Sequence, residues 1–247
     1  MNRMIGCTLA LLALPASLSG QTLSQRITAL GEGNLRLSFA AREGVCGSSH
    51  GISITTQSDE WVGDCARGPV RVSLRVRSGR LTEAHTYVGG RWRAPQAHTI
   101  DLGMLPARSA ASELLALAEA SSADADDLIT AATLADSATV WPTLLRIARA
   151  RTVPVETRRQ AVFWLGQAAG EAAVRGLDSI VVDTSSDLEV RKQAVFALSQ
   201  RPADEGVPAL ISVARTSRHP ELRKTALFWL GQSEDPRALA LFEEILR

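Results

Sequence analysis

The string "RRQAVFWLGQ" at residues 158–167 decides the fold, because the chain repeats it twice. "RKQAVFALSQ" occupies residues 191–200 and "RKTALFWLGQ" occupies residues 223–232, so the copies begin 33 and then 32 residues apart. Repetition at this interval is typical of proteins that stack helical units side by side. We therefore expect a helical repeat domain over residues 106–247, in which each copy forms the first helix of a pair.

The segments that follow the copies also correspond to one another. "WPTLLRIARA" at residues 141–150 aligns with "VPALISVART" at residues 207–216, and "ALALFEEIL" at residues 238–246 keeps the same apolar spacing. A degenerate first unit covers residues 126–136 and 140–149. The sequence thus predicts about four helix pairs, each with a motif helix and a second helix.

This repeat resembles the short bacterial HEAT-repeat family, including its phycobilisome-lyase-like branch. The resemblance covers residues 106–247 and leaves the N-terminal half unrecognised. It implies a right-handed α-superhelix that serves as a binding platform, and a minority of the family are chromophore-attachment factors. The residues that carry it are Arg158, Ala161, Val162, Leu165 and Gly166, then Val190, Arg191, Ala194, Val195 and Leu198, then Leu222, Arg223, Ala226, Leu227 and Leu230.

A buried stripe runs along each motif helix. A helix advances 100° per residue, which groups Ala161 with Thr157, Val162 and Leu165 on the inward side. The small Ala at the centre lets neighbouring helices approach to roughly 8–10 Å. Trp164 lies on the flank, where we expect it to fill space between units. The equivalent stripes are Val190, Ala194, Val195 and Leu198, then Leu222, Ala226, Leu227 and Leu230.

The Phe of each copy lies on the opposite side of the helix from the buried Ala, with a Gln four residues later on the same face. Stacked units would align these residues into a band about 20 Å long, whose apolar area marks an interaction site. Three interpretations of this band are open. It binds a separate protein partner, it is covered by the chain's own β-rich module as an intramolecular lid, or it is part of the core because the helix phase differs. The predicted band consists of Phe163, Gln167, Phe196, Gln200, Phe228 and Gln232.

Residues 21–105 predict a β-rich module. "VRVSLRVR" at residues 70–77 alternates apolar and polar residues with a period of two, which is typical of a strand with one buried face. Ser78 and Gly79 form a turn signal, so residues 81–88 are expected to return as the second strand of a hairpin. The fold class is therefore α+β and mainly α, a solenoid preceded by a small β-rich module.

Three shorter segments complete this half. "NLRLSFA" at residues 34–40 and "GISITT" at residues 51–56 predict strands, and we interpret "TIDLGML" at residues 99–105 as the hinge between the halves. Cys46 and Cys65 lie 19 residues apart, and in an exported chain they predict one disulfide worth roughly 3 kcal/mol of loop entropy. Two free thiols in a reducing compartment are the alternative.

Two sets of arginines invite a functional or a structural interpretation. Arg71, Arg75 and Arg77 share the polar face of the first hairpin strand, where they would bind an acidic partner or an envelope polyanion. A solvated face whose charges prevent edge pairing is the simpler interpretation. A second set begins each motif, and we expect it to tie one unit to the next through carboxylate or carbonyl groups. This second set is Arg158, Arg191 and Arg223.

The first 20 residues have the layout of a secretory signal peptide. Arg3 supplies a positive charge, "MIGCTLALLAL" is an apolar core, and Pro15 followed by "ASLSG" offers a cleavage region near Gly20. A retained membrane anchor and a lipoprotein attached through Cys7 are the alternatives. We therefore expect a periplasmic or secreted protein.

The sequence carries few signals of catalytic, metal-binding or nucleic-acid-binding chemistry. A net charge of +1 provides no overall attraction to nucleic acid or to an anionic membrane. None of the four histidines (His50, His85, His98, His219) has metal-ligand spacing, and the sequence lacks a G-x-S-x-G elbow and a phosphate-binding glycine loop. We expect no catalytic residue, metal, cofactor, nucleic acid or membrane span.

The sequence therefore predicts a monomeric, non-catalytic, exported protein-binding scaffold or regulator. Two other functions remain open. One is an envelope protein that binds glycan or polyanion through the arginine-rich strand face, and the other is a lyase-type modification factor.

Overall fold

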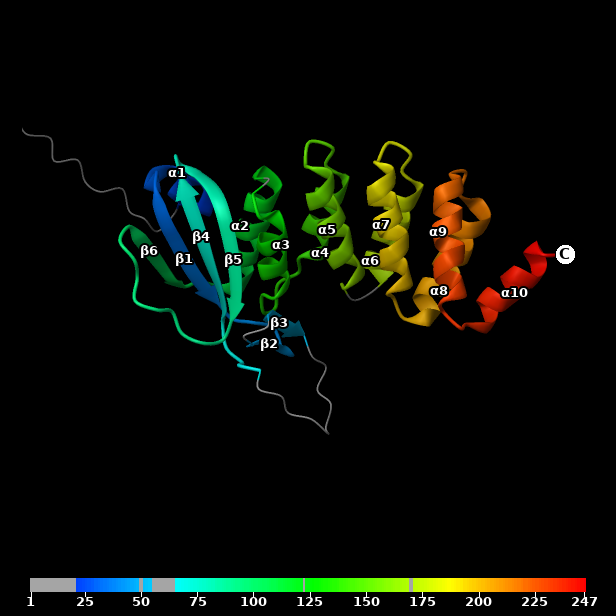
Figure 1. Cartoon of the computed structure of the whole chain (residues 1–247), viewed down its shortest axis with the longest axis horizontal. Helices are drawn as coiled ribbons and strands as arrows, with labels where there is room; N and C mark the ends of the chain where they lie inside the picture. The colour runs from blue at the N-terminus through cyan, green and yellow to red at the C-terminus, as the bar shows by residue number, and fades with distance from the viewer. Residues whose placement is uncertain (1–20, 49–50, 55–64, 122, 169–170) are drawn as a thin grey trace, which may run out of the picture.

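The computed structural model describes residues 21–48, 51–54, 65–121, 123–168 and 171–247, so the predicted signal peptide lies outside it. Within these residues, ten helices and six strands form a mainly helical structure. Figure 1 shows the sheet at the N-terminal end, followed by helices that stand side by side in a row toward the C-terminus. The predicted solenoid preceded by a small β-rich module is confirmed.

The N-terminal module holds a four-stranded sheet and a separate two-stranded ribbon. The strands are β1 (Gly33–Phe39), β2 (Val45–Ser48), β3 (Gly51–Ile54), β4 (Val70–Arg77), β5 (Arg80–Val88) and β6 (Thr99–Met104). The sheet has the order β5-β4-β1-β6, and β2 pairs with β3 in the ribbon. Strands β4 and β5 form the predicted hairpin, and the turn places Ser78 and Gly79 at positive φ angles of 52° and 68°.

Two parts of the module differ from the sequence predictions. The segment interpreted as a hinge is strand β6, which pairs in parallel with β1. That prediction was wrong because β6 is an edge strand whose residues are all partly or fully exposed, so it has no apolar alternation. The module also begins with helix α1 (Leu23–Leu30), whose eight residues are too few to establish a helical period.

Strand β4 shows the predicted alternation of faces. Val70, Val72, Leu74 and Val76 are buried, and the polar residues between them face the other side. The buried face belongs to one hydrophobic core that continues through the helices. The last strand ends at Met104 and the next helix begins at Ala107, and the core continues across this change.

Cys46 and Cys65 form a disulfide with their Cα atoms 5.3 Å apart. Beside it, the Gly47 and Ala66 amides each donate to the other's carbonyl at 3.0 and 2.8 Å. Gly47 lies so close to the end of β5 that a Cβ there would meet the Val88 carbonyl oxygen at 2.2 Å. The ribbon is thereby held against the end of the sheet.

The remaining helices stack in two layers. They are α2 (Ala107–Ala120), α3 (Ala125–Thr133), α4 (Trp141–Arg149), α5 (Val155–Gly166), α6 (Glu171–Val182), α7 (Leu188–Ser199), α8 (Ala203–Thr216), α9 (Pro220–Gly231) and α10 (Pro236–Ile245). Helices α3, α5, α7 and α9 pack on one another in one layer, and α2, α4, α6 and α8 form the other. The three motif copies are therefore α5, α7 and α9, neighbours in space as well as in pattern.

The predicted buried stripe is confirmed in α5 and α7. Thr157, Ala161, Val162 and Leu165 are at most 4% exposed, and all four equivalents in α7 are 0% exposed. In α9 the stripe holds except at Leu227, which is half-buried. The C-terminal motif helix has one less neighbour to cover its flank, so its stripe is less completely enclosed.

Helices α5 and α7 meet at a contact between backbones. A Cβ on Gly166, the last residue of α5, would lie 2.8 Å from the Ala197 Cβ and 3.3 Å from its Cα. Real Cβ atoms do not approach this closely, so the crossing admits only hydrogen at this point. The crossing therefore pairs a Gly on α5 with a small Ala on α7.

The arginine that begins each motif ties adjacent units together, as predicted. The buried Arg158 pairs with Asp187, the residue that precedes α7, and is itself 2% exposed. The Arg191 Nε donates at 2.9 Å to a carbonyl in the last turn of α6. The Arg223 Nη1 donates, also at 2.9 Å, to a carbonyl just after α8. The bonds of Arg191 and Arg223 give partners to backbone carbonyls at or just after the ends of α6 and α8.

The sheet is attached to the solenoid through the edge of β5. The Ala84 amide donates to the Asp124 carboxylate at 2.8 Å, and the Thr86 amide donates to the Asp127 carboxylate at 3.1 Å. Both aspartates belong to the start of α3. Their carboxylates satisfy the amides of an edge strand, a position that is prone to pairing with other chains when it is open.

The contact at Gly166 predicts a position-specific effect. Gly166→Ala is expected to force α5 and α7 apart and to destabilise the chain by about 1–3 kcal/mol, the usual cost of overpacking. Gly231→Ala, at the same motif position in α9, is the matched control, because a Cβ there has only Phe242 nearby, at 3.9 Å. The control should be neutral or stabilising by up to about 1 kcal/mol. Urea unfolding of both variants measures the difference, and equal effects would contradict the packing argument.

Candidate functional site

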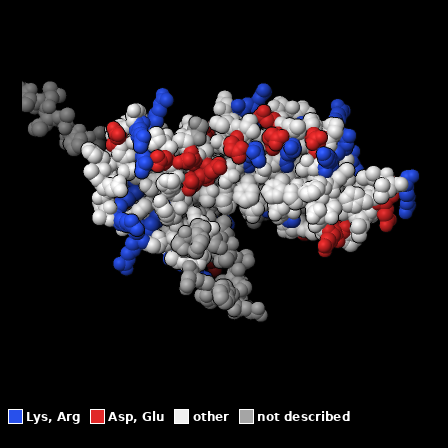
Figure 2. Space-filling view, in the orientation of Figure 1, with Lys and Arg blue, Asp and Glu red and all other residues white. Residues whose placement is uncertain are grey.

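The outer side of α5, α7 and α9 carries three parallel rows of side chains. The first row is charged and lies toward the helix N-termini, where Glu156 pairs with Arg159 at 2.9 Å and Glu189 with Lys192 at 3.3 Å. Figure 2 shows this row of alternating acidic and basic groups across the three helices, with an uncharged stripe beside it. In each motif helix, the Phe and the Gln follow the Glu by seven and eleven residues. Positions at these intervals lie on one face of a helix, so stacking the helices produces three rows.

The second row contains the phenylalanines predicted to point away from the core. Phe228 is 57% exposed, and Phe163 and Phe196 are half-buried. None of the three joins the fully buried residues. The helix phase inferred from the motif is therefore right, and these rings are not core.

The third row consists of the motif glutamines. Gln167, Gln200 and Gln232 are the C-cap residues of their helices, and all three are exposed. A Gln amide offers both donors and an acceptor. The row thus places groups that can bond a peptide backbone along one edge of the phenylalanines.

Two tryptophans pack against the phenylalanines and form two aromatic groups. The rings of Phe163 and Trp164 lie 5.4 Å apart, edge to face. The Trp229 ring lies 5.1 Å from Phe196 on the preceding motif helix and 5.0 Å from Phe228 on its own. Trp229 therefore packs between units, the role predicted for Trp164 at the same motif position. We call these five residues the aromatic band.

The sheet does not serve as a lid on the aromatic band. Within the layer of motif helices, β5 packs against α3, the first of the row, and Figure 1 shows the sheet at that end. The described sheet therefore does not act as the intramolecular lid that was one of the alternatives for this surface. The band remains open at Phe228.

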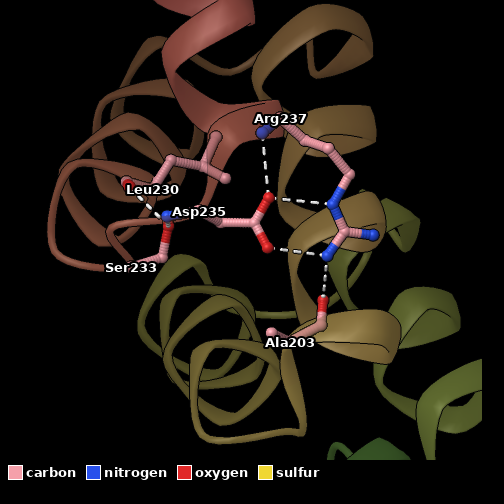
Figure 3. A network of polar contacts seen from close by, with 5 residues as sticks. All are labelled: Ala203, Leu230, Ser233, Asp235 and Arg237. Atoms are coloured by element: carbon pink, nitrogen blue, oxygen red, sulfur yellow. Dashed lines mark hydrogen bonds and ion pairs between the residues drawn. The ribbon is translucent and has the colours of Figure 1, made fainter.

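A cavity of about 310 Å³ lies at the C-terminal end of the band. Gln200, Trp229 and Gln232 line it, together with residues of α8. The network in Figure 3 borders it, since Ala203 and Ser233 belong to both. The band therefore ends in a recess rather than on a flat surface.

The network in Figure 3 anchors the last helix. Asp235 caps α10 by accepting from the Arg237 amide at 2.9 Å, and it also accepts from the Arg237 guanidinium at 2.9 and 2.8 Å. Arg237 in turn donates to the Ala203 carbonyl at the start of α8, at 2.8 Å. The hydrogen bonds from Arg237 lower the pKa of Asp235 to about 2. The carboxylate thus remains charged through the physiological range.

The residues named on the basic strand face separate in the structure. Arg71 and Arg75 line a groove on the open face of the sheet, while Arg77 lies at the hairpin end, outside it. Arg36 and Trp92, which were not predicted from the sequence, line the same groove. The signal was the "GGRWR" string at residues 89–93, in which a Gly-Gly turn precedes basic and aromatic residues.

Residues 176–247 match the family model for HEAT repeats. This C-terminal segment is a HEAT-repeat segment. It extends from the middle of α6 to the end of the chain and includes two of the three motif helices, α7 and α9. No curated protein matches the chain.

The described residues offer neither a metal cluster nor a membrane-spanning helix. Among them, no three or more His, Cys, Asp or Glu side chains are grouped so that they could hold a metal ion. No helix in the described part of the chain is both long and apolar enough to cross a bilayer.

The Asp235 anchor predicts a local and pH-dependent effect. Asp235→Asn is expected to speed amide exchange in α10 while leaving α5 unchanged, because only the last helix loses its cap. A carboxyl with a lowered pKa stabilises the fold fully above its ordinary pKa of 3.8 and loses the effect as the pH falls toward about 2. The difference in α10 amide exchange between Asp235→Asn and the parent should therefore narrow as the pH falls from 3.8 to about 2.

Hydrogen exchange followed by mass spectrometry measures this effect. Glu243→Gln is the matched control, since Glu243 lies on α10 but its partner Arg247 is 3.9 Å away and both are exposed. An equal effect of the two substitutions would show that the cap does not anchor α10.

Proposed function

We propose that the protein is a non-catalytic, exported scaffold or regulator that captures a protein partner on the aromatic band. The observation that carries the proposal is a row of partly or fully exposed Phe rings, one in each of three successive repeats. Exposed patches of this kind on a folded chain mark interaction sites. The HEAT-repeat match over residues 176–247 supports a binding platform as the general role.

The chemistry of the three rows defines the partner. Aromatic rings bind apolar side chains, and the row of glutamines supplies hydrogen bonds for the peptide backbone. The charged row is balanced, because Glu156 and Glu189 each have a basic neighbour. Net charge therefore contributes little to partner choice, and apolar contact dominates.

The spacing of the repeats favours an extended partner segment. Packed helices lie about 8–10 Å apart, so the rings recur at that interval across α5, α7 and α9. A polyproline II segment rises about 3.1 Å per residue with three residues per turn, which brings every third side chain to one side at about 9 Å. An apolar residue at every third position would match the band, and this is a known way of docking on aromatic surfaces.

Replacing Phe163, Phe196 and Phe228 with Ser together tests the proposal. The triple variant should bind a fluorescent peptide of repeated Leu-Pro-Pro triplets at least about tenfold more weakly, because truncating a central aromatic contact costs about 1–2 kcal/mol or more. Fluorescence anisotropy measures binding, and far-ultraviolet circular dichroism should show an unchanged helical signal.

The control for this experiment removes exposed apolar side chains from other helices. Val182 and Leu239 are 70% and 60% exposed and lie on α6 and α10, so Val182→Ser with Leu239→Ser should leave peptide binding unchanged. Equal binding by parent and triple variant would contradict the proposal. Unfolding of the triple variant would instead show that the rings are structural.

Export makes a separate prediction. The chain recovered from its native cells should lack residues 1–20 and contain Cys46 and Cys65 as a disulfide, because such bonds persist in oxidising compartments. Intact-mass measurement with and without reduction tests both features. A cytoplasmic chain that retains Met1 and two free thiols would contradict export.

A further inference from the structure

A groove of about 860 Å³ crosses the face of the sheet that points away from the hydrophobic core. Strands β1, β4 and β5 form its floor, and the segment that follows β5, residues 89–96, contributes to its walls. None of its lining residues belongs to the aromatic band, so the proposed function leaves it without a role. Its size is within the usual range of ligand sites.

The strand register arranges the groove side chains in rows. Residues paired across β5, β4 and β1 project on the same face, because side chains alternate along each strand. Each row crosses the three strands and contains one arginine. The rows are Tyr87–Arg71–Ser38, His85–Ser73–Arg36 and Glu83–Arg75–Asn34.

Trp92 fixes two arginines in the groove. The guanidinium groups of Arg36 and Arg71 lie 5.3 and 5.8 Å from the centre of its ring. The indole N–H donates to Ser38 Oγ at 3.3 Å, and the Arg71 Nη1 donates to the same oxygen at 3.2 Å. Because Ser38 is only 5% exposed, these bonds are shielded from water. The arrangement preorganises the arginines before any ligand is present.

A glycine turn holds this arrangement in place. Gly89 and Gly90 have positive φ angles of 68° and 62°, which reverse the chain after β5. Their carbonyls accept from the Arg71 Nε and Nη2, each at 3.0 Å. A Cβ on Gly89 would meet the Ala66 carbonyl oxygen at 2.7 Å, beside the disulfide. The groove wall is thus built on constrained backbone.

The groove is strongly basic. Five arginines line it and no aspartate or glutamate does; the arginines are Arg36, Arg71, Arg75, Arg91 and Arg93. Two carboxylates flank it, Asp101 at 2.8 Å from Arg36 and Glu83 at 3.1 Å from Arg75. Within the described residues no ion pair neutralises the other three arginines. Figure 2 shows basic groups gathered at the sheet end of the molecule.

We propose that this groove binds an acidic polysaccharide, a chain of sugar rings that carries carboxylate or sulfate groups. Guanidinium groups bind such anions through paired N–H donors, and the arginines here are spread along the groove rather than focused on one point. That spread fits a ligand with repeated charges. A single small anion would leave most of the arginines unused.

The groups between the arginines favour sugar over other polyanions. Asn34, Ser73 and His85 offer uncharged hydrogen-bonding groups that match hydroxyls between the charges. Tyr87 is 49% exposed and presents a ring against which the apolar face of a sugar can lie. Single-stranded nucleic acid usually stacks successive bases on several open rings, whereas the Trp92 ring is already covered by two guanidinium groups.

The test uses the full chain with its disulfide intact, a soluble polyuronate as ligand, and isothermal titration calorimetry. Arg91→Glu with Arg93→Glu is expected to weaken binding by about tenfold or more, since both side chains line the groove without an ion pair. Tyr87→Ala should also weaken it, because the sugar loses its stacking surface. Thermal melting should show that these exposed substitutions leave the fold intact.

The matched control reverses the same number of charges outside the groove. Arg77→Glu with Arg80→Glu lies at the other end of the same hairpin and should change binding by less than about twofold at moderate salt. Equal loss in both double variants would overturn the proposal in favour of general charge attraction. So would an absence of polyuronate binding by the parent chain.

Two further ligands separate the alternatives. A neutral polysaccharide of similar length should not bind, because the arginines would lack partners. Poly-glutamate should bind more weakly than polyuronate and without dependence on Tyr87. Equal binding of poly-glutamate and polyuronate, with no effect of Tyr87→Ala, would overturn the proposal and indicate an acidic protein segment instead.

Discussion

The close contact between successive motif helices is the constraint on which the structure depends. Gly166 and Ala197 bring the backbones of α5 and α7 together so tightly that no Cβ fits at Gly166. Once the helices are this close, the aliphatic residues beside Ala161 and Ala194 are enclosed. The phenylalanines lie on the outer side because each follows the buried Ala by two residues, which is about half a helical turn. The phenylalanines and the buried spine therefore recur with the same period.

The end of the solenoid is a second constraint, and the sheet meets it. A stack of repeats exposes an apolar face at each end unless something covers it. At the N-terminal end, α3 is covered by β5, with Asp124 and Asp127 bonded to its edge amides. The carboxylates at the start of α3 satisfy the amides of the sheet edge, and β5 covers the end of the helix row. It also explains why the sheet lies at the end of the row and leaves α5, α7 and α9 uncovered.

The features that recur or follow a local pattern could be predicted from the sequence. Features that depend on contacts between distant, non-equivalent segments could not. The buried stripe, the position of Phe163 and the role of Arg191 follow from one helical period seen three times. The disulfide and the β4–β5 hairpin follow from spacing and alternation. Strand β6 was missed because an exposed edge strand has no alternation to detect. The groove was missed because Arg36, Arg71 and Trp92 come from three separate segments, and only the sheet register and the turn at Gly89 bring them together.

The distribution of charge shows how a nearly neutral chain can still select ligands by charge. The net charge of +1 argues against a global attraction to polyanions, but net charge describes only the sum. Along the motif helices, Glu156 and Glu189 are paired with basic neighbours, so the proposed partner of that surface would be selected by apolar contact. In the sheet groove the arginines outnumber the flanking carboxylates, so the proposed ligand there would be selected by charge. One continuous core joins the sheet to the helices, so both surfaces belong to one packed structure.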